Sequence, residues 1–203
     1  YAVTMPRSPW KEYGHGGVVG VGNHWGETVT WESSTDAKSL SKEDAAFSRL
    51  ELHYKCHRHG GTFLLFIDGK QVRKVDTRCK KAQYGIFKLR VKHGHHKVKI
   101  VARRPMVTLY GAVFENDRPG IVVDGLGVGA LNFYKLLDID RKVFRDGLRS
   151  RKYDLVILTT GTTMWSKPMH FRWARKLIKR IRDALGPKIP ILIFSPPPFG
   201  KRY

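Results

Sequence analysis

Acidic side chains are scarce in this sequence. Its 17 Asp and Glu residues stand against 38 Lys and Arg residues, which leaves a formal charge of +21 at pH 7. The first 117 residues carry 20 basic and 11 acidic side chains, and the remainder carries 18 and 6. A protein this basic attracts polyanions such as acidic polysaccharide, nucleic acid, anionic lipid or teichoic-type polymers. Charge alone leaves open the alternative of a solubilising surface without a partner.

Long apolar runs and targeting features are also missing. No stretch of about 18 apolar residues occurs, so no membrane span is expected. The opening residues YAVTMPRSPW show no basic and apolar regions of a secretory signal. Only two cysteines are present, Cys56 and Cys79. Their spacing is compatible with one disulfide across adjacent strands and equally with two free buried thiols.

Residues 48–116 alternate between apolar and polar side chains, as half-buried strands do. The residues before them, rich in Gly, Trp, Ser and Thr, indicate loops with short strands. Asp68-Gly69 predicts a tight hairpin turn. Together these features predict a jelly-roll-like antiparallel β-sandwich over residues 1–117. The expected strands are SRLELHY (48–54), GTFLLFIDG (61–69), KQVRKVDT (70–77), YGIFKLRVKHG (84–94), HHKVKIVARR (95–104) and MVTLYGAVFEN (106–116).

The hydrophobic period changes near Arg118-Pro119, where we place the domain boundary. Continuous apolar runs predict buried strands of the parallel-sheet type. Two helices are expected between them, one interrupted at Gly147 and one stopped by Gly186-Pro187. The alternation predicts an α/β unit over residues 118–203. The strands are PGIVVDGLG (119–127), YDLVILTTG (153–161) and IPILIFSPPP (189–198), and the helices are RKVFRDGLRSRK (141–152) and HFRWARKLIKRIRDALG (170–186), whose expected apolar face is Phe171, Ala174, Leu177, Ile178, Ile181 and Leu185.

The order of these pieces resembles the SGNH (GDSL-type) esterase family, in particular bacterial members that carry a β-sandwich inside the hydrolase domain. The resemblance covers nearly the whole chain and implies a partial three-layer α/β sheet of the SGNH type after the sandwich. Each motif is weak alone, and the order and spacing carry the likeness. The segments are RSPWKEYGHGGV (7–18), GGTFLLFIDGKQV (60–72), HGHHKVKIVA (93–102), VTLYGAVFENDRPGIVVDGLGVGA (107–130), YDLVILTTGTT (153–163) and ILIFSPPP (191–198).

The resemblance implies acyl transfer, with a Ser nucleophile in a Gly-Asp-Ser block and a His base in an Asp-x-x-His block. This sequence contains neither block. We therefore expect the nucleophile and the base to lie upstream of Tyr1 and downstream of Tyr203. The chain alone is expected to be inactive as an esterase.

The oxyanion-hole candidates also follow from the resemblance. In DGLGVGALN the backbone donor falls on Gly129 or Ala130, and the family Asn falls on Thr163. Losing one side-chain donor of this kind costs roughly 3–4 kcal/mol of transition-state stabilisation. The alternatives are a tight strand-to-helix turn for the glycines and a strand-end or N-cap role for Thr163.

Clusters of histidine raise the question of a metal site. Cys56, His57 and His59 lie close together, as do His93, His95 and His96. Neutral imidazole and thiolate suit zinc. His95 and His96 point to opposite faces of a strand, however, and neither cluster has helical spacing. We therefore expect structural or surface histidines, with no metal and no organic cofactor.

Two further groups are candidates for binding polymers. Trp10, Trp25 and Trp31, set among Gly and polar residues, could stack on sugar rings or could be core aromatics of the sandwich. A basic helix face could bind a polyanion or could simply be solvated. Its candidate residues are Arg172, Arg175, Lys176 and Lys179, followed along the helix by Arg180 and Arg182.

The favoured interpretation is a segment of a secreted, periplasmic or cell-surface carbohydrate esterase that removes O-acetyl groups from a polysaccharide. The alternative is a glycan- or polyanion-binding protein that keeps the hydrolase fold without catalysis. The missing Ser and His blocks and the Thr at position 163 favour this alternative. The expected partner is a polysaccharide or another acidic polymer, in preference to nucleic acid.

Overall fold

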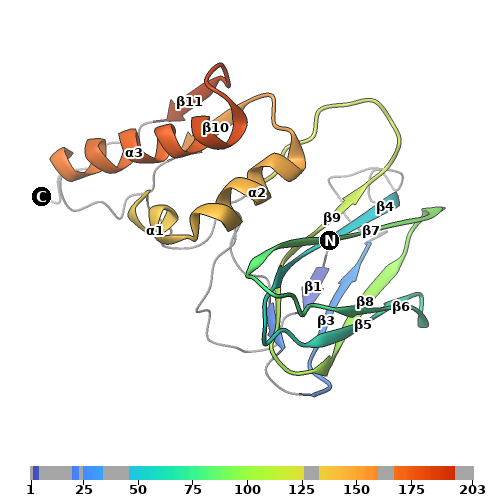
Figure 1. Cartoon of the computed structure of the whole chain (residues 1–203). Helices are drawn as coiled ribbons and strands as arrows, with labels where there is room; N and C mark the ends of the chain where they lie inside the picture. Colours follow the sequence, from blue (N-terminus) through green and yellow to red (C-terminus); the bar gives the residue numbers. More distant parts are fainter. Residues whose placement is uncertain are drawn as a thin grey trace, which may run out of the picture. The chain divides into compact units, whose positions relative to one another are not determined.

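We analysed a computed structural model that describes residues 2–4, 20–22, 25–33, 46–125, 133–159 and 167–194 (Figure 1). The described residues form two compact units. One holds the residues up to Asp124, and the other holds those from Gly125 onward. The described backbone of the first unit is mostly antiparallel β-sheet, and the described helices lie in the second unit.

The first unit is a β-sandwich of two antiparallel sheets, as the alternation predicts. The five-stranded sheet has the order β1 (Ala2–Thr4), β3 (Thr28–Glu32), β8 (Lys97–Arg104), β5 (Thr62–Ile67) and β6 (Lys70–Asp76). The four-stranded sheet has the order β2 (Gly20–Gly22), β9 (Val107–Glu115), β4 (Phe47–Cys56) and β7 (Gln83–Gly94). Strands β7 and β8, consecutive in the chain, therefore belong to different sheets.

Inward-facing side chains of both sheets form one core. Along β5 from Phe63 to Ile67 and along β8 from Val98 to Ala102, every second residue is buried, because successive side chains of a strand point to opposite faces. Trp31 of β3 joins this core and is 5% exposed. The members with 2% exposure or less are Phe47, Leu50, Leu52, Phe63, Leu65, Val98, Ile100 and Val107.

The turn between β5 and β6 is the one that Asp68-Gly69 predicts. Both residues have positive φ, 50° and 79°, as a type I′ turn requires. The Asp68 carboxylate accepts a hydrogen bond from the Lys97 backbone N–H at 2.8 Å, and its other oxygen lies 2.7 Å from His96 Nδ1. His96 Nε2 lies 2.7 Å from the Lys92 carbonyl oxygen. With acceptors at both ring nitrogens, His96 is held as a double donor that ties this turn to the β7–β8 connection.

A disulfide closes the opposite end of the sandwich. It joins Cys56 and Cys79, whose Cα atoms lie 5.7 Å apart, within the usual range for a disulfide. Beside it the chain passes very close to its neighbours at Gly61. A Cβ added there would lie 2.1 Å from the Pro105 carbonyl oxygen and 2.2 Å from that of Arg104. Only glycine allows this approach.

The second unit contains α1 (Phe133–Asp138), α2 (Arg141–Arg151), β10 (Val156–Thr159), α3 (Lys167–Leu185) and β11 (Ile191–Phe194). Strands β10 and β11 pair in parallel, and α3 connects them, which gives the predicted βαβ arrangement. The helices bury a common set of apolar residues, Phe133, Val143, Phe144, Leu148, Ala174, Leu177, Ile181 and Ala184. Arg180 donates hydrogen bonds to the carbonyls of Leu136, Leu137 and Ile139 at the end of α1.

Four details of this unit differ from the expectations. The strands β10 and β11, which were expected to be buried, are largely exposed, with Ile157 and Phe194 each 51% exposed. Helix α2 runs without a break through Gly147, which is buried inside it. Phe171 is 65% exposed and lies outside the buried face of α3. The described part of 119–127 forms no strand: Ile121 is 94% and Val123 83% exposed, and no described strand pairs with their backbone. An apolar run becomes a strand only where a partner satisfies its backbone.

The close approach at Gly61 predicts a large loss of stability for Gly61→Ala. We expect the free energy of unfolding to fall by roughly 2–4 kcal/mol, because the new methyl group overlaps two carbonyl oxygens. Urea denaturation measures the change. Gly120→Ala is the matched control, since a Cβ there meets nothing within 4 Å. Equal stability of the two variants would contradict the prediction.

The Asp68–His96 pair predicts a stability that depends on pH. Burial alone lowers the pKa of His96, but its hydrogen bonds to Asp68 and to the Lys92 carbonyl outweigh burial and raise this pKa. The hydrogen bond from His96 in turn lowers the pKa of Asp68. A raised histidine pKa gives stability that is complete below the ordinary value of about 6.5 and is lost as pH rises through the raised value.

We expect this contribution, about 0.5–1 kcal/mol for a partly exposed pair, to disappear in Asp68→Asn. Asparagine suits the same turn, so the backbone is retained. The stability of both proteins is measured by thermal denaturation from pH 6 to pH 9. Subtracting one stability curve from the other removes the contribution of the other histidines, which both proteins share. A variant with the same pH slope as the parent would refute the assignment.

Candidate functional site

The outer face of the five-stranded sheet is built around β8, the central strand of that sheet. Val98, Ile100 and Ala102 of β8 point into the core. The alternate residues Lys97, Lys99, Val101 and Arg103 therefore point outward, and all except Val101 are cationic. A strand places such neighbours about 6.6–6.8 Å apart, so the cations form a spaced row.

The strands on both sides of β8 complete this face. Val101 lies opposite Thr28 of β3 and Leu64 of β5. In the next row Lys99 lies between Thr30 and Phe66. The aliphatic and aromatic side chains of these rows, Val101, Leu64 and Phe66, are half-buried. The face thus has an apolar floor, with hydroxyl and ammonium groups above it.

Trp25 stands at the end of this face and is 65% exposed. The Gly26 N–H donates to the Ala102 carbonyl at 2.7 Å, which brings the preceding turn beside β8. The Arg103 guanidinium lies over the indole ring of Trp25, 4.6 Å from its centroid. This cation–π contact holds a large aromatic surface in place while leaving it open to solvent.

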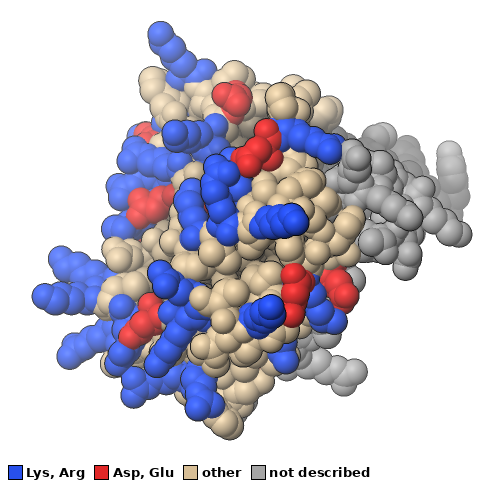
Figure 2. Space-filling view, turned by 90° about the vertical axis from the view of Figure 1, so that its right-hand side faces the viewer, with Lys and Arg blue, Asp and Glu red and all other residues tan. Residues whose placement is uncertain are grey.

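The cations of this face are poorly balanced by acids. Lys97 pairs with Glu32 at 2.9 Å. Lys99, Arg103 and Lys74, which lies opposite Leu64 on β6, have no carboxylate within 4.0 Å among the described residues. Figure 2 shows a wider excess of Lys and Arg over Asp and Glu across the face in view. The outer face of the five-stranded sheet can therefore receive an anionic or hydroxyl-rich ligand without breaking an internal ion pair.

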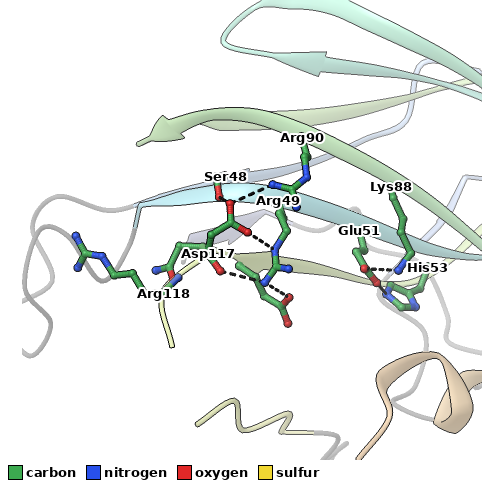
Figure 3. A network of polar contacts seen from close by, with 10 residues as sticks. Ser48, Arg49, Glu51, His53, Lys88, Arg90, Asp117 and Arg118 are labelled. Carbon is green, nitrogen blue, oxygen red and sulfur yellow. Dashed lines mark hydrogen bonds and ion pairs between the residues drawn. The ribbon is translucent and has the colours of Figure 1, made fainter. Parts of the chain in front are cut away.

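The outer face of the four-stranded sheet carries a network of ion pairs in two parts, one around Asp117 and one around Glu51 (Figure 3). Arg49 of β4 lies 3.2 Å from Glu115 and 3.5 Å from Asp117, and donates to the Asn116 carbonyl at 3.0 Å. Arg90 of β7 reaches the same Asp117 at 3.1 Å. Both arginines therefore have a carboxylate partner, whereas Lys99 and Arg103 on the face around Trp25 have none among the described residues.

The second part of this network centres on Glu51. One carboxylate oxygen accepts a hydrogen bond from Lys88 Nζ at 2.6 Å, and the other lies 3.4 Å from His53 Nε2. His53 is 3% exposed, and its Nδ1 lies 2.9 Å from the Tyr84 hydroxyl. The Tyr84 ring stacks on Tyr110 with centroids 5.1 Å apart. Because its ion pairs and hydrogen bonds link β4, β7 and β9, we assign the network to holding the sheet together.

The two described tryptophan candidates lie in different environments. Trp31 lies in the core, 5% exposed, and its ring is 6.2 Å from that of Phe114. Trp25 is exposed on the outer face of the five-stranded sheet. Trp10 and the three oxyanion-hole candidates, Gly129, Ala130 and Thr163, lie outside the described residues. One of the three aromatic candidates is therefore placed where a ligand could reach it.

Arg103 was missed by sequence reasoning. The segment HHKVKIVARR did contain a signal for it, because Lys97, Lys99 and Arg103 stand at even spacings along a strand and so point to the same face. The contact with Trp25 depends on tertiary structure, because the two residues are far apart in the chain. The cationic candidates on α3 are all exposed: Arg172, Arg175, Lys176 and Lys179.

Among the described residues no three His, Cys, Asp or Glu side chains come together as metal ligands would. Cys56 is engaged in its disulfide, and His96 in its contacts with Asp68 and Lys92. No helix in the described part of the chain has the length and apolar character needed to cross a membrane.

Comparison with known proteins gives no family model that matches and no curated protein that matches. Among solved structures, a family 35 carbohydrate-binding module from an environmental isolate is similar at a TM-score of 0.36 and 12% identity, over 60% of this chain and 88% of that one. Another such module, from Clostridium thermocellum, is similar at 0.33 and 10%, over 54% of this chain and 84% of that one.

A two-domain esterase active on acetylated mannans is similar at a TM-score of 0.38 and 11% identity, over 50% of this chain. The matched region spans 29% of the length of that esterase.

Proposed function

We propose that this chain binds a glycan on the outer face of the five-stranded sheet, with Trp25 as the stacking platform. The observation that carries the proposal is the exposed indole of Trp25, held in place by Arg103 at 4.6 Å. The exposed indole offers a flat apolar surface that the C–H face of a sugar ring can cover, which removes apolar area from water. A pre-positioned ring also reduces the conformational entropy that binding would otherwise lose.

The residues beside Trp25 suit a sugar ligand. Thr28 and Thr30 supply hydroxyl groups that donate and accept, and Lys99 supplies a charged donor. Val101 and Phe66 provide apolar surface for the C–H faces of sugar rings. A mostly apolar surface with a few placed polar groups is the usual composition of a binding site for small ligands.

We further propose that residues 118–203 are an α/β segment of the SGNH type and that residues 1–117 are its carbohydrate-binding partner. The parallel pair β10–β11 with its crossover helix α3 supports this second, esterase-related function. Acyl transfer of this type requires a Ser nucleophile and a His base. The Gly-Asp-Ser and Asp-x-x-His blocks that would provide them do not occur in these 203 residues.

The disulfide supports placement outside the reducing cytosol. Disulfides persist in secreted, periplasmic and cell-surface proteins, where thiols are not kept reduced. The Cys56–Cys79 bridge ties the ends of two segments that flank the β5–β6 hairpin. A polysaccharide of the cell envelope or the extracellular space is a ligand present in the same compartments.

Trp25→Ala tests the glycan site. We expect the protein to be retarded in native gels that contain one or both of the uncharged polysaccharides mannan and xylan, each used in native and O-deacetylated form. The variant should bind the retained polysaccharide roughly 10- to 30-fold more weakly, as expected for loss of a central aromatic contact.

Trp25→Phe is the matched control, because it keeps an aromatic ring at the same position and should retain part of the affinity. Unchanged binding by Trp25→Ala, or no retardation by any polysaccharide, would rule the site out.

Esterase turnover has a separate test. We expect the chain alone to hydrolyse p-nitrophenyl acetate no faster than a heat-inactivated sample, because the Ser and His blocks are missing. Turnover that a serine-directed phosphonate abolishes would show that another serine serves as the nucleophile.

A further inference from the structure

Helix α3 presents a row of cations along one side. Its opposite side is buried through Ala174, Leu177, Ile181 and Ala184. At 3.6 residues per turn, the basic residues at spacings of three and four fall on the exposed side and span about 15 Å of helix. We call this set the α3 track: Arg172, Arg175, Lys176, Lys179 and Arg182, all exposed.

The α3 track is almost without internal counter-charge. Lys179 lies 3.5 Å from Asp183, and within the described residues no other member has a carboxylate within 4.0 Å. Nearby arginines behave differently. Arg180 donates to the carbonyls at the end of α1, and Arg149 donates to the Ala184 carbonyl at 2.7 Å. These two arginines hold the helices together, whereas the track cations contribute nothing to that packing.

The α3 track leads into an open depression of about 820 Å³ at the ends of α2 and α3. Three cations, Arg182 of the track with Arg149 and Lys152, line this depression beside Tyr153 and one acid, Asp183. The volume lies in the range of small-molecule pockets. A row of exposed cations that ends in a cationic hollow suits an extended polymer with one part seated in the hollow.

We infer that the α3 track and this depression bind a carboxylated polysaccharide. Arginine and lysine provide charge-assisted hydrogen bonds to carboxylates, and arginine does so in a bidentate manner. The helix presents one level of cations per turn, about every 5.4 Å, which is on the scale of one carboxylate per sugar unit. This surface belongs to the second unit and is separate from the Trp25 site on the sandwich.

Nucleic acid fits the α3 track less well. Duplex DNA carries one negative charge per about 1.7 Å of its axis, much denser than one level of cations per helical turn. Arginine and lysine also bind phosphates without reading sequence, so a DNA duplex is the competing ligand in the test below. The α3 track consists of Arg and Lys only.

The test uses the whole chain and three polymers: unesterified polygalacturonate, fully methyl-esterified polygalacturonate, and a short DNA duplex. The variant R175Q/K176Q removes two track cations that have no ion-pair partner among the described residues, and Gln maintains the helix. The control K80Q/K81Q removes two adjacent exposed lysines from the sandwich unit. Circular dichroism confirms that both variants fold.

We expect R175Q/K176Q to bind polygalacturonate roughly 5- to 10-fold more weakly, and K80Q/K81Q to stay within about twofold of the parent. Lys152→Asn, which keeps a residue suited to the positive φ of 50° at that position, should also weaken binding because it removes a cation of the depression. Trp25→Ala should leave this binding unchanged, so failure here is distinguishable from failure of the glycan site.

Four results would overturn the inference. The first is no binding of polygalacturonate by the parent, and the second is an equal loss in both double variants. The third is equal binding of the methyl-esterified polymer, which has the same backbone without charge. The fourth is tighter binding of DNA that the track variant abolishes, which would identify nucleic acid as the partner.

Discussion

Burial of inward-facing side chains between two antiparallel sheets is the constraint on which the rest of the sandwich depends. Phe47, Leu50, Phe63 and Leu65 are nearly inaccessible to solvent. Because side chains alternate along a strand, each buried residue determines which neighbours face outward. The outward row of side chains on β8 and the polar network on β4 both follow from this alternation. A slip of one residue in the pairing would bury Lys99 and expose Ile100.

The two outer faces of the sandwich use charge in different ways. On the four-stranded sheet, Arg49 and Arg90 share Asp117, and Lys88 is paired with Glu51. On the five-stranded sheet, Lys99 and Arg103 have no such partners among the described residues. The protein has many more cations than acids, so some cations have no internal carboxylate partner. A polyanion gains the most binding energy where such cations remain, on the outer face of the five-stranded sheet and on the α3 track.

The helical unit combines a conventional core with two sets of cations. Leu177 and Ile181 of α3 pack with the apolar faces of α1 and α2, while Arg180 satisfies the last carbonyls of α1. The two-stranded parallel sheet leaves Ile157 and Leu192 about half exposed. Parallel sheets are normally covered on both faces, so this sheet offers apolar surface that the described residues do not cover.

Local patterns accounted for much of this protein. The alternation in residues 48–116, the Asp68-Gly69 turn and the buried face of α3 were all readable from spacing, because each depends on neighbours in the chain. Contacts between distant residues decided the remainder. Trp25 and Trp31 look alike in the sequence, yet one stacks under Arg103 and the other fills the core. Likewise, packing brought Cys56 within reach of Cys79, and no strand in the described part of the chain pairs with Ile121. Burial and backbone pairing depend on partners that spacing alone does not specify.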